Sequence, residues 1–169
     1  MDMNDELTAS DLAKMEAEIE ERKLVLRPKL IEAVKEARAQ GDLSENFEYY
    51  AAKREKNRNE SRIRYLERMV RTAIVVSDES KDDEVGLNNT VTVYFEEDDE
   101  EEVDRIVTTV REDSLHGLIS KESPLGAALM GHKEGDRVKV DVNETYSYYV
   151  VIRKIEKTDD DSGDKIRSF

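Results

Sequence analysis

Two stretches of helical periodicity, separated by one short turn, constrain this chain more than any other feature. Apolar side chains recur every three or four positions in residues 12–37, and the same spacing returns in residues 47–73. Gly41 lies between them, where a left-handed helix end is expected. Because the turn is too short for anything but an antiparallel return, the sequence predicts a coiled-coil hairpin over residues 1–76 with its tip at 41–50.

The two apolar stripes predict which faces of the hairpin pack together. They consist of Leu12, Met15, Ile19, Leu26, Leu30, Val34 and Ala37 on the first helix, and Phe47, Tyr50, Ala51, Ile63, Leu66, Val70 and Ala73 on the second. Pro28 lies inside the first stripe, and proline lacks the N–H that a helix interior needs. We therefore expect a kink or a local break near residues 24–27.

Two acidic residues at the tip allow two interpretations. Asp42 can cap the start of the second helix, with Glu45 three residues later completing a capping box. Spacing alone favours this interpretation. The position favours another one, because two carboxylates beside Phe47 and Tyr49 at the end of a hairpin are well placed to present chemistry to a partner.

Composition limits the class of protein. Of the 169 residues, 40% are charged and 37% are hydrophobic, which argues against one large core and for solvated helices with a smaller globular part. The absence of cysteine excludes disulfides and thiolate metal sites. No apolar run reaches the length of a membrane span, and the acidic N-terminus does not resemble a signal peptide. We expect a cytoplasmic protein without a membrane partner.

Charge is distributed unevenly along the chain. The net charge is −14, and residues 1–75 hold 15 basic against 16 acidic residues, which leaves 12 against 25 in residues 76–169. The acidic C-terminal part should avoid free nucleic acid, because phosphate binding depends on lysine and arginine. Its expected partner is a protein.

A basic stripe interrupts this acidity in the second helix. Arg54, Arg58 and Arg62 are spaced four residues apart and therefore share one helix face. One interpretation pairs them with acids of the first helix. The other is a basic track leading to the tip, suited to a phosphate backbone. The sequence leaves both open.

Three motifs resemble the Gre transcript cleavage factors of bacterial RNA polymerase. They are Arg27-Pro28, the string Gly-Asp-Leu-Ser-Glu-Asn-Phe-Glu-Tyr at 41–49, and Ala51-Ala52-Lys53. In that family such a string lies at the tip of a coiled coil. The resemblance implies tip contacts by Ser44, Asn46, Phe47 and Tyr49. Two residues depart from the family pattern: Asp11 stands where glycine is usual, and Phe47 where a small residue is usual.

The C-terminal part has the periodicity of strands. A polar stretch at 77–86 is expected to be a linker, and strands are expected at 90–95, 103–110, 117–120, 137–142 and 146–155, with the acidic run 96–102 as a loop. Residues 123–131 predict a short helix capped by Ser123, begun by Pro124 and ended by Gly131. The last hairpin turn, Asn143-Glu144, lacks the glycine that the family uses. Residues 158–169 are expected to be a disordered acidic tail.

This C-terminal pattern also resembles the Gre family, and it implies an α+β protein. The implied C-terminal domain, residues 87–157, is an FKBP-like sheet around a short helix that docks on RNA polymerase. The residues that would carry the docking are Ser123, Pro124, Leu125, Leu129 and Gly131.

The resemblance also implies a mechanism that two carboxylates can support. Mg²⁺ takes oxygen ligands and is commonly held by one or two carboxylates, so Asp42 and Glu45 amount to half of a metal site. Carried through the secondary channel of a backtracked polymerase, they would complete a Mg²⁺ site there, while Arg54, Arg58 and Arg62 guide the RNA 3′ end. The chain would then be a monomeric factor and not itself an enzyme.

Two rival functions remain at this point. A non-cleaving regulator or inhibitor could use the same hairpin to occupy the secondary channel. A stand-alone nucleoside-phosphate enzyme would need a phosphate cradle or a catalytic base, and the sequence contains neither pattern.

Overall fold

The computed structural model describes residues 5–40, 46–159 and 163–168. Contacts within the chain divide it into two units. The helical unit comprises Met1–Asp5 and Leu12–Ala73, and the β-unit comprises Glu6–Asp11 and Ile74–Phe169. The α+β class expected from the sequence is confirmed. No helix in the described residues combines the length and the apolar character needed to cross a bilayer.

The first side of the hairpin is a helical path with a defect in its middle. It consists of α1 (Ala9–Glu21), a π-helical turn (Arg22–Leu26) and α2 (Arg27–Ala39), and it is followed by α3 (Phe47–Thr72). Pro28 lies in the first turn of α2, directly after the π-helical turn. The irregularity expected near residues 24–27 is confirmed as this π-helical turn, and the helical path continues through it, because Glu21, Leu26 and Arg27 keep α-helical backbone angles.

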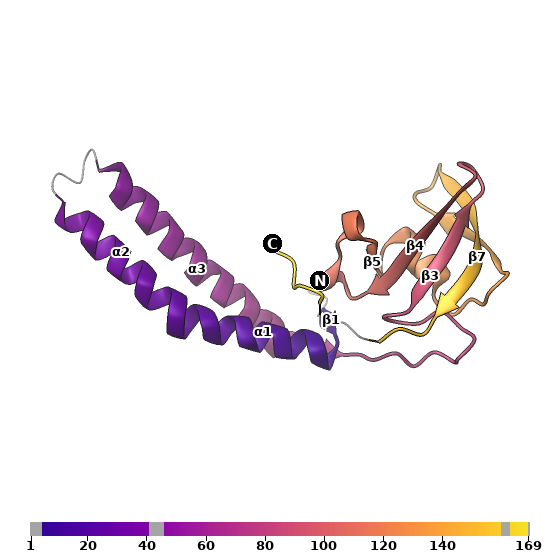
Figure 1. Cartoon of the computed structure of the whole chain (residues 1–169), viewed down its shortest axis with the longest axis horizontal. Helices are drawn as coiled ribbons and strands as arrows, with labels where there is room; N and C mark the ends of the chain where they lie inside the picture. The colour runs from indigo at the N-terminus through magenta and orange to yellow at the C-terminus, as the bar shows by residue number, and fades with distance from the viewer. Residues whose placement is uncertain (1–4, 41–45, 160–162, 169) are drawn as a thin grey trace. The chain divides into compact units, whose positions relative to one another are not determined.

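The two sides of the hairpin lie next to each other along α2 and α3 (Figure 1). Ala37 of α2 and Ile63, Leu66 and Met69 of α3 are buried, in agreement with the helical stripes except that Met69 was not expected. The prediction was wrong at the start of α3. Phe47 and Tyr50 are 84% and 44% exposed, and Tyr49 is the buried residue.

The start of α3 also differs from the prediction. Asn46 is its N-cap, with its Oδ1 accepting a hydrogen bond from the Tyr49 amide at 3.0 Å. The expected cap was Asp42, four residues earlier, so that assignment is wrong. Asparagine satisfies the orphan amide as well as aspartate does.

The β-unit is built on a five-stranded sheet in the order β5-β4-β3-β7-β6. Its strands are β3 (Thr90–Phe95), β4 (Glu100–Val107), β5 (Leu118–Ser120), β6 (Arg137–Asp141) and β7 (Ser147–Glu156). β5 runs parallel to β4, and the other pairs are antiparallel. The acidic run was expected to be a loop, but Glu100–Glu102 belong to β4, where the three side chains are exposed and keep their contact with water.

One face of this sheet carries the core. Val91, Val93, Ile106, Val138, Val140, Val150 and Ile152 form it together with Val85 and Leu129. Leu129 belongs to the short helix α4 (Pro124–Leu129), whose predicted cap Ser123 is confirmed by a hydrogen bond from the Gly126 amide at 3.0 Å. Gly126 has no room for a side chain, because a Cβ there would lie 2.1 Å from the Ser120 carbonyl oxygen.

A buried network of charges joins distant segments of the β-unit. Thr8 and Asp11 form a reciprocal capping box, in which each side chain accepts a hydrogen bond from the other's amide at 3.1 and 2.9 Å. Asp11 Oδ1 also lies 2.6 Å from the Nε of Arg111, and both side chains are fully buried. Asp11 thus has a structural role that glycine at this position could not fill.

The same network reaches the C-terminal segment. Arg111 Nη1 lies 2.9 Å from Asp164, which also pairs with Arg105. The backbone amide of Arg167 donates to the Val110 carbonyl at 2.8 Å. The described part of the expected disordered tail, residues 163–168, therefore makes specific contacts with the β-unit.

Candidate functional site

The side chain of Asn46 joins the two helices at the end of the hairpin. Besides capping α3, Asn46 donates through Nδ2 to the carbonyl oxygen of Ala37 at 2.6 Å, so it connects the start of α3 to the end of α2. The predicted metal ligands Asp42 and Glu45, and the predicted contact Ser44, lie outside the described residues. In the sequence they occupy the short connection between these two joined helix ends.

The two aromatic tip residues have different surroundings. Phe47 is 84% exposed, whereas Tyr49 is only 9% exposed. The Tyr49 ring lies 5.5 Å from the guanidinium carbon of Arg38, and a hydrogen bond from Arg38 lowers the pKa of the Tyr49 hydroxyl. Tyr49 therefore packs within the hairpin, and Phe47 is the aromatic side chain that is accessible to a partner.

The three arginines of the basic stripe also have different surroundings. Arg62 is 7% exposed and binds Glu18 of α1 through Nε and Nη2, at 2.8 and 3.1 Å. Burial acts to raise the pKa of Glu18, but the hydrogen bonds and charges of Arg62 and Arg22 outweigh it, so this pKa is lowered. Arg62 therefore fits the interpretation in which arginines of the stripe pair with acids of the first helix.

The other two arginines of the stripe are exposed. The Arg58 side chain is 73% exposed and pairs with Glu55 of its own helix, at 2.6 Å, and Arg54 is exposed as well. An exposed ion pair of this kind is weak and easily exchanged. Arg54 and Arg58 are therefore the members of the stripe that can reach a phosphate.

Arg27, the first residue of the Arg-Pro motif, joins the two helices. Its Nε and Nη2 donate to the two carboxylate oxygens of Glu60, both at 2.9 Å. The hydrogen bonds from Arg27 lower the pKa of Glu60. Such a bidentate pair fixes the register of α2 against α3, and thereby the position of the hairpin end.

Sequence reasoning missed a second interhelical contact beside it. Asn59 is 3% exposed; it accepts a hydrogen bond from Arg22 Nη1 at 2.9 Å and donates to the Arg22 carbonyl oxygen at 3.3 Å. Arg22 begins the π-helical turn, where the altered helix geometry makes a carbonyl available to a partner. The one sequence signal was a polar residue inside the apolar stripe of α3.

The residues predicted to dock on the polymerase lie on and around α4. Pro124 and Gly131 are exposed and Leu125 is half-buried, but Leu129 is fully buried in the core. Ser123 is engaged as the cap and donates to the Ser120 carbonyl at 2.7 Å. The structure thus separates this set into accessible residues and residues that only support the helix.

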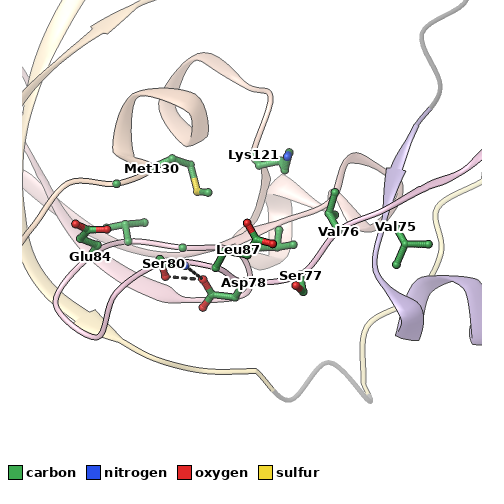
Figure 2. Close-up of a pocket in the computed structure, with 13 residues that line it drawn as sticks. Val75, Val76, Ser77, Asp78, Ser80, Glu84, Leu87, Lys121 and Met130 are labelled. Atoms are coloured by element: carbon green, nitrogen blue, oxygen red, sulfur yellow. Dashed lines mark hydrogen bonds between the residues drawn. The ribbon is translucent and has the colours of Figure 1, made fainter.

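A pocket of about 420 Å³ lies next to α4. Figure 2 shows Met130 and Lys121 lining it from one side and Asp78, Ser80 and Leu87 from the other. The stretch expected as a linker, 77–86, contributes to this wall. It is held in place by Lys157, whose ammonium donates to Ser80 Oγ and the Glu84 carbonyl, both at 2.7 Å.

The donor chemistry of the tip fits Mg²⁺ only in part. Within residues 5–40, 46–159 and 163–168 no cluster of three or more histidine, cysteine, aspartate or glutamate side chains could hold a metal ion. Asp42 and Glu45 are oxygen donors of the kind that Mg²⁺ prefers, but two carboxylates leave most of its six positions open. They fit a site that another molecule completes.

A helical hairpin with an acidic connection at its end, followed by a mixed sheet with a capped short helix, is the architecture of a transcription elongation factor. Residues 6–75 match the family model described as "Transcription elongation factor, N-terminal", and residues 79–157 match "Transcription elongation factor, GreA/GreB, C-term". The chain belongs to the GreA/GreB family of transcription elongation factors.

Two relatives named GreA agree with this assignment. The chain is 46% identical over 153 residues to "Transcription elongation factor GreA" of Streptococcus pneumoniae. The aligned residues make up 90% of this chain and 95% of the relative. Identity to the GreA of Streptococcus gordonii is the same, with the same coverage. Among solved structures, GreA factor homolog 1 of Thermus thermophilus is 24% identical, with a TM-score of 0.42, over 91% of this chain and 99% of that protein.

Proposed function

We propose that this chain rescues backtracked bacterial RNA polymerase by carrying Asp42 and Glu45 through the secondary channel to the polymerase active centre. The coarser function follows from the family: the chain is a transcription elongation factor that stimulates transcript cleavage by RNA polymerase. The cleavage activity belongs to the polymerase, and the factor contributes side chains to it.

The observation that carries the proposal is the position of the acidic segment in the hairpin. Residues 41–45 connect α2 to α3, and Asn46 joins the ends of these helices through hydrogen bonds to Ala37 and Tyr49. The Arg27–Glu60 pair fixes the register of the helices behind that end. The two helix ends that flank the acidic segment are thus held together, which supports a role for this end of the hairpin in contacting a partner.

Asp42 and Glu45 are the residues that would hold Mg²⁺, together with ligands from the polymerase. A bound ion of this type supplies activation of water and stabilisation of the leaving oxygen. The role of the chain is to bring the two carboxylates to the site and to keep them oriented. Exposed Phe47 supports a contact with the polymerase or with a base next to this position.

Arg54 and Arg58 are proposed to guide the extruded RNA 3′ end. Both are exposed on α3 and lie four residues apart, so they offer positive charge along one face leading toward the hairpin end. Arg62 is left out of this role, because Glu18 already neutralises it.

The β-unit is proposed to dock on the polymerase through the accessible surface of α4. Pro124, Leu125 and Gly131 form the accessible part of this surface, while Ser123 and Leu129 hold the helix in place. We further propose that the factor acts as a monomer in the bacterial cytoplasm, where RNA polymerase works.

An RNA cleavage assay on stalled elongation complexes tests this function. Asp42→Asn and Glu45→Gln should each slow the appearance of shortened RNA by on the order of 100-fold or more, because metal-ion catalysis contributes several kcal/mol. Glu48→Gln is the matched control, since Glu48 is an exposed acid in the first turn of α3, and it should cleave like wild type.

The same assay separates the proposal from its rival. If the intact chain slows transcription but yields no shortened RNA, the protein is a non-cleaving regulator of the secondary channel. If both acid variants cleave at the wild-type rate, the proposed role of the two carboxylates is wrong.

A further inference from the structure

Carboxylates of β4 lie on the same side of the sheet as the apolar core. In the β3–β4 pair, Asp104 lies opposite Val91 and Glu102 lies opposite Val93, and both valines belong to the core. Because side chains alternate between the faces of a strand, Asp104, Glu102 and Glu100 are on the core-facing side of β4. Asp104 is buried there, whereas Glu102 and Glu100 are exposed toward the end of the strand. Charged residues are rare at such positions unless they are paired.

Within the part of the chain that the structure describes, no lysine or arginine pairs with Asp104. Its side chain is 6% exposed, and its Oδ2 atom has no hydrogen-bond partner in the described part of the protein. Burial first, and then the charge of Glu102 and a hydrogen bond with its carboxyl group, raise the pKa of Asp104 to about 6. A buried carboxylate without a counter-charge lowers stability, so this residue is not explained by folding.

Aromatic rings lie on the same face of the sheet as Asp104 and Glu102. Tyr148 stacks on Phe95 with ring centroids 6.0 Å apart and lies 5.9 Å from the Tyr146 ring. The Tyr146 hydroxyl donates to Glu97 at 2.7 Å. Burial first, and then the charges of nearby acids including Glu102 and Asp104, raise the pKa of Tyr148, which places its hydroxyl in their field. We name Phe95, Glu97, Glu102, Asp104, Tyr146 and Tyr148 the acidic aromatic cluster.

On the opposite face of the same sheet, tyrosine rings are in contact with arginines of the chain. There, the guanidinium of Arg137 lies 3.7 Å from the centre of the Tyr149 ring, and that of Arg153 lies 4.6 Å from the centre of Tyr94. The strand registers put no lysine or arginine at a core-facing position of the described strands β3 to β7. The outward tyrosines have a cation from the chain, and the inward ones have only acids.

We propose that the acidic aromatic cluster binds a lysine or arginine side chain of RNA polymerase. A cation there would neutralise the carboxylates of Asp104 and Glu102 and rest against the aromatic faces, two interactions that reinforce each other in a partly buried site. The choice of polymerase as the partner rests on the proposed function, whereas the chemistry of the bound group follows from the cluster itself.

Binding of the full-length chain to core RNA polymerase tests this. In a fluorescence anisotropy titration, the double variant Glu102→Gln/Asp104→Asn should bind at least about tenfold more weakly, as expected when one partner of a buried charge pair is removed. The control Asp98→Asn/Glu101→Gln removes the same two charges from exposed positions of the same hairpin, and it should stay within about twofold of wild type.

The melting temperature of each variant shows whether weaker binding could come from misfolding. Asp104→Asn should keep or raise the melting temperature, because it removes an unpaired buried charge, so weaker polymerase binding cannot be blamed on unfolding. Unchanged affinity in the Glu102→Gln/Asp104→Asn variant overturns the proposal, and so does equal weakening in the control, which would reveal only long-range electrostatic attraction.

Two further arms separate the remaining explanations. If MgCl₂ or CaCl₂ alone raises the melting temperature of wild type but not of the cluster variant, the cluster is an inorganic cation site and the proposal is wrong. The Asp42→Asn/Glu45→Gln variant should retain polymerase affinity while losing cleavage, so failure of the proposed cleavage role is seen separately. Absence of any binding by the wild-type chain would overturn both proposals.

Discussion

The helical unit and the β-unit both contain interior charges, but they enclose them to different degrees. In the hairpin, the side chains of Arg62 and Glu18 are 8% and 26% exposed, and those of Arg27 and Glu60 are 34% and 28% exposed. In the β-unit, the side chains of Arg111 and Asp11 are both fully buried. Water can replace a lost partner in the first case and cannot in the second.

This difference indicates how the two units divide the work. The hairpin holds its register with ion pairs at its surface, and its apolar interface is thin, which suits an element that presents residues at its end. The β-unit encloses both its apolar core and its charge network, which suits a body that must keep one docking surface. The consequences of substitution should differ accordingly.

Arg111→Met should have the largest effect and would test the enclosed network directly. It leaves buried Asp11 without its counter-charge and removes one of the two arginines that pair with Asp164, so we expect the free energy of unfolding to fall by about 3–5 kcal/mol. Urea denaturation measures the loss, and hydrogen exchange of separate peptides shows whether it is confined to the β-unit. A loss below about 1 kcal/mol would contradict the distinction between the units.

Asp104→Asn should change stability in the opposite direction. The pKa of Asp104 is raised from its ordinary value of 3.8 to about 6, so the folded protein retains a proton there that the unfolded chain has lost. The unfolding free energy of wild type therefore falls as the pH rises from about 4 to about 6. At pH 7 the variant should be more stable by on the order of 2 kcal/mol.

The pH dependence supplies the control for that prediction. Near pH 4 the carboxyl group is protonated in the folded wild type, so the gain from Asp104→Asn should be nearly lost. A gain that is equal at pH 4 and pH 7, measured by urea denaturation, would show that charge is not its cause.

Arg62→Ala in the hairpin should cost less than the Arg111 substitution. Glu18 keeps Arg22 as a partner at 2.7 Å and remains partly exposed, so we expect a loss of about 1 kcal/mol. Hydrogen exchange of α1 and α3 peptides measures it, with exposed Arg64→Ala as the matched control. A cost similar to that of Arg111→Met would remove the contrast between the two units.

Arg58→Ala should have the smallest effect on stability, below about 0.5 kcal/mol, because its ion pair with Glu55 is exposed. Its effect should instead appear in function, as a several-fold drop in crosslinking of the RNA 3′ end to α3 in backtracked complexes. Arg71→Ala removes an exposed arginine near the other end of the same helix. Equal crosslinking in the two variants would mean that Arg58 does not guide RNA.

Local chemistry made part of this fold predictable. Pro28 alone located the break in the first helix, because its missing N–H acts within one turn. The bounds of β3 and the cap of α4 followed from β-branched periodicity and from the Ser-Pro pair. Each of these signals depends on residues that are neighbours in the sequence.

Pairings between distant residues could not be predicted in the same way. The burial of Arg62 depends on Glu18, which is 44 positions away, and the burial of Arg111 depends on Asp11 and Asp164. Asn46 caps α3 while its amide also reaches Ala37, nine positions earlier, and sequence spacing does not indicate that contact. The charge of Asp104 on an apolar face has no sequence signal apart from the alternation of β4.

The dependence of cleavage rate on Mg²⁺ concentration tests the central claim most directly. We propose that Asp42 and Glu45 supply some of the ligands of a Mg²⁺ ion, and that the polymerase supplies the others. The wild-type factor should then reach its maximal cleavage rate at a lower Mg²⁺ concentration than the Asp42→Asn factor. Binding to the polymerase should be the same for both. Superimposable Mg²⁺ curves for the two proteins would contradict the account.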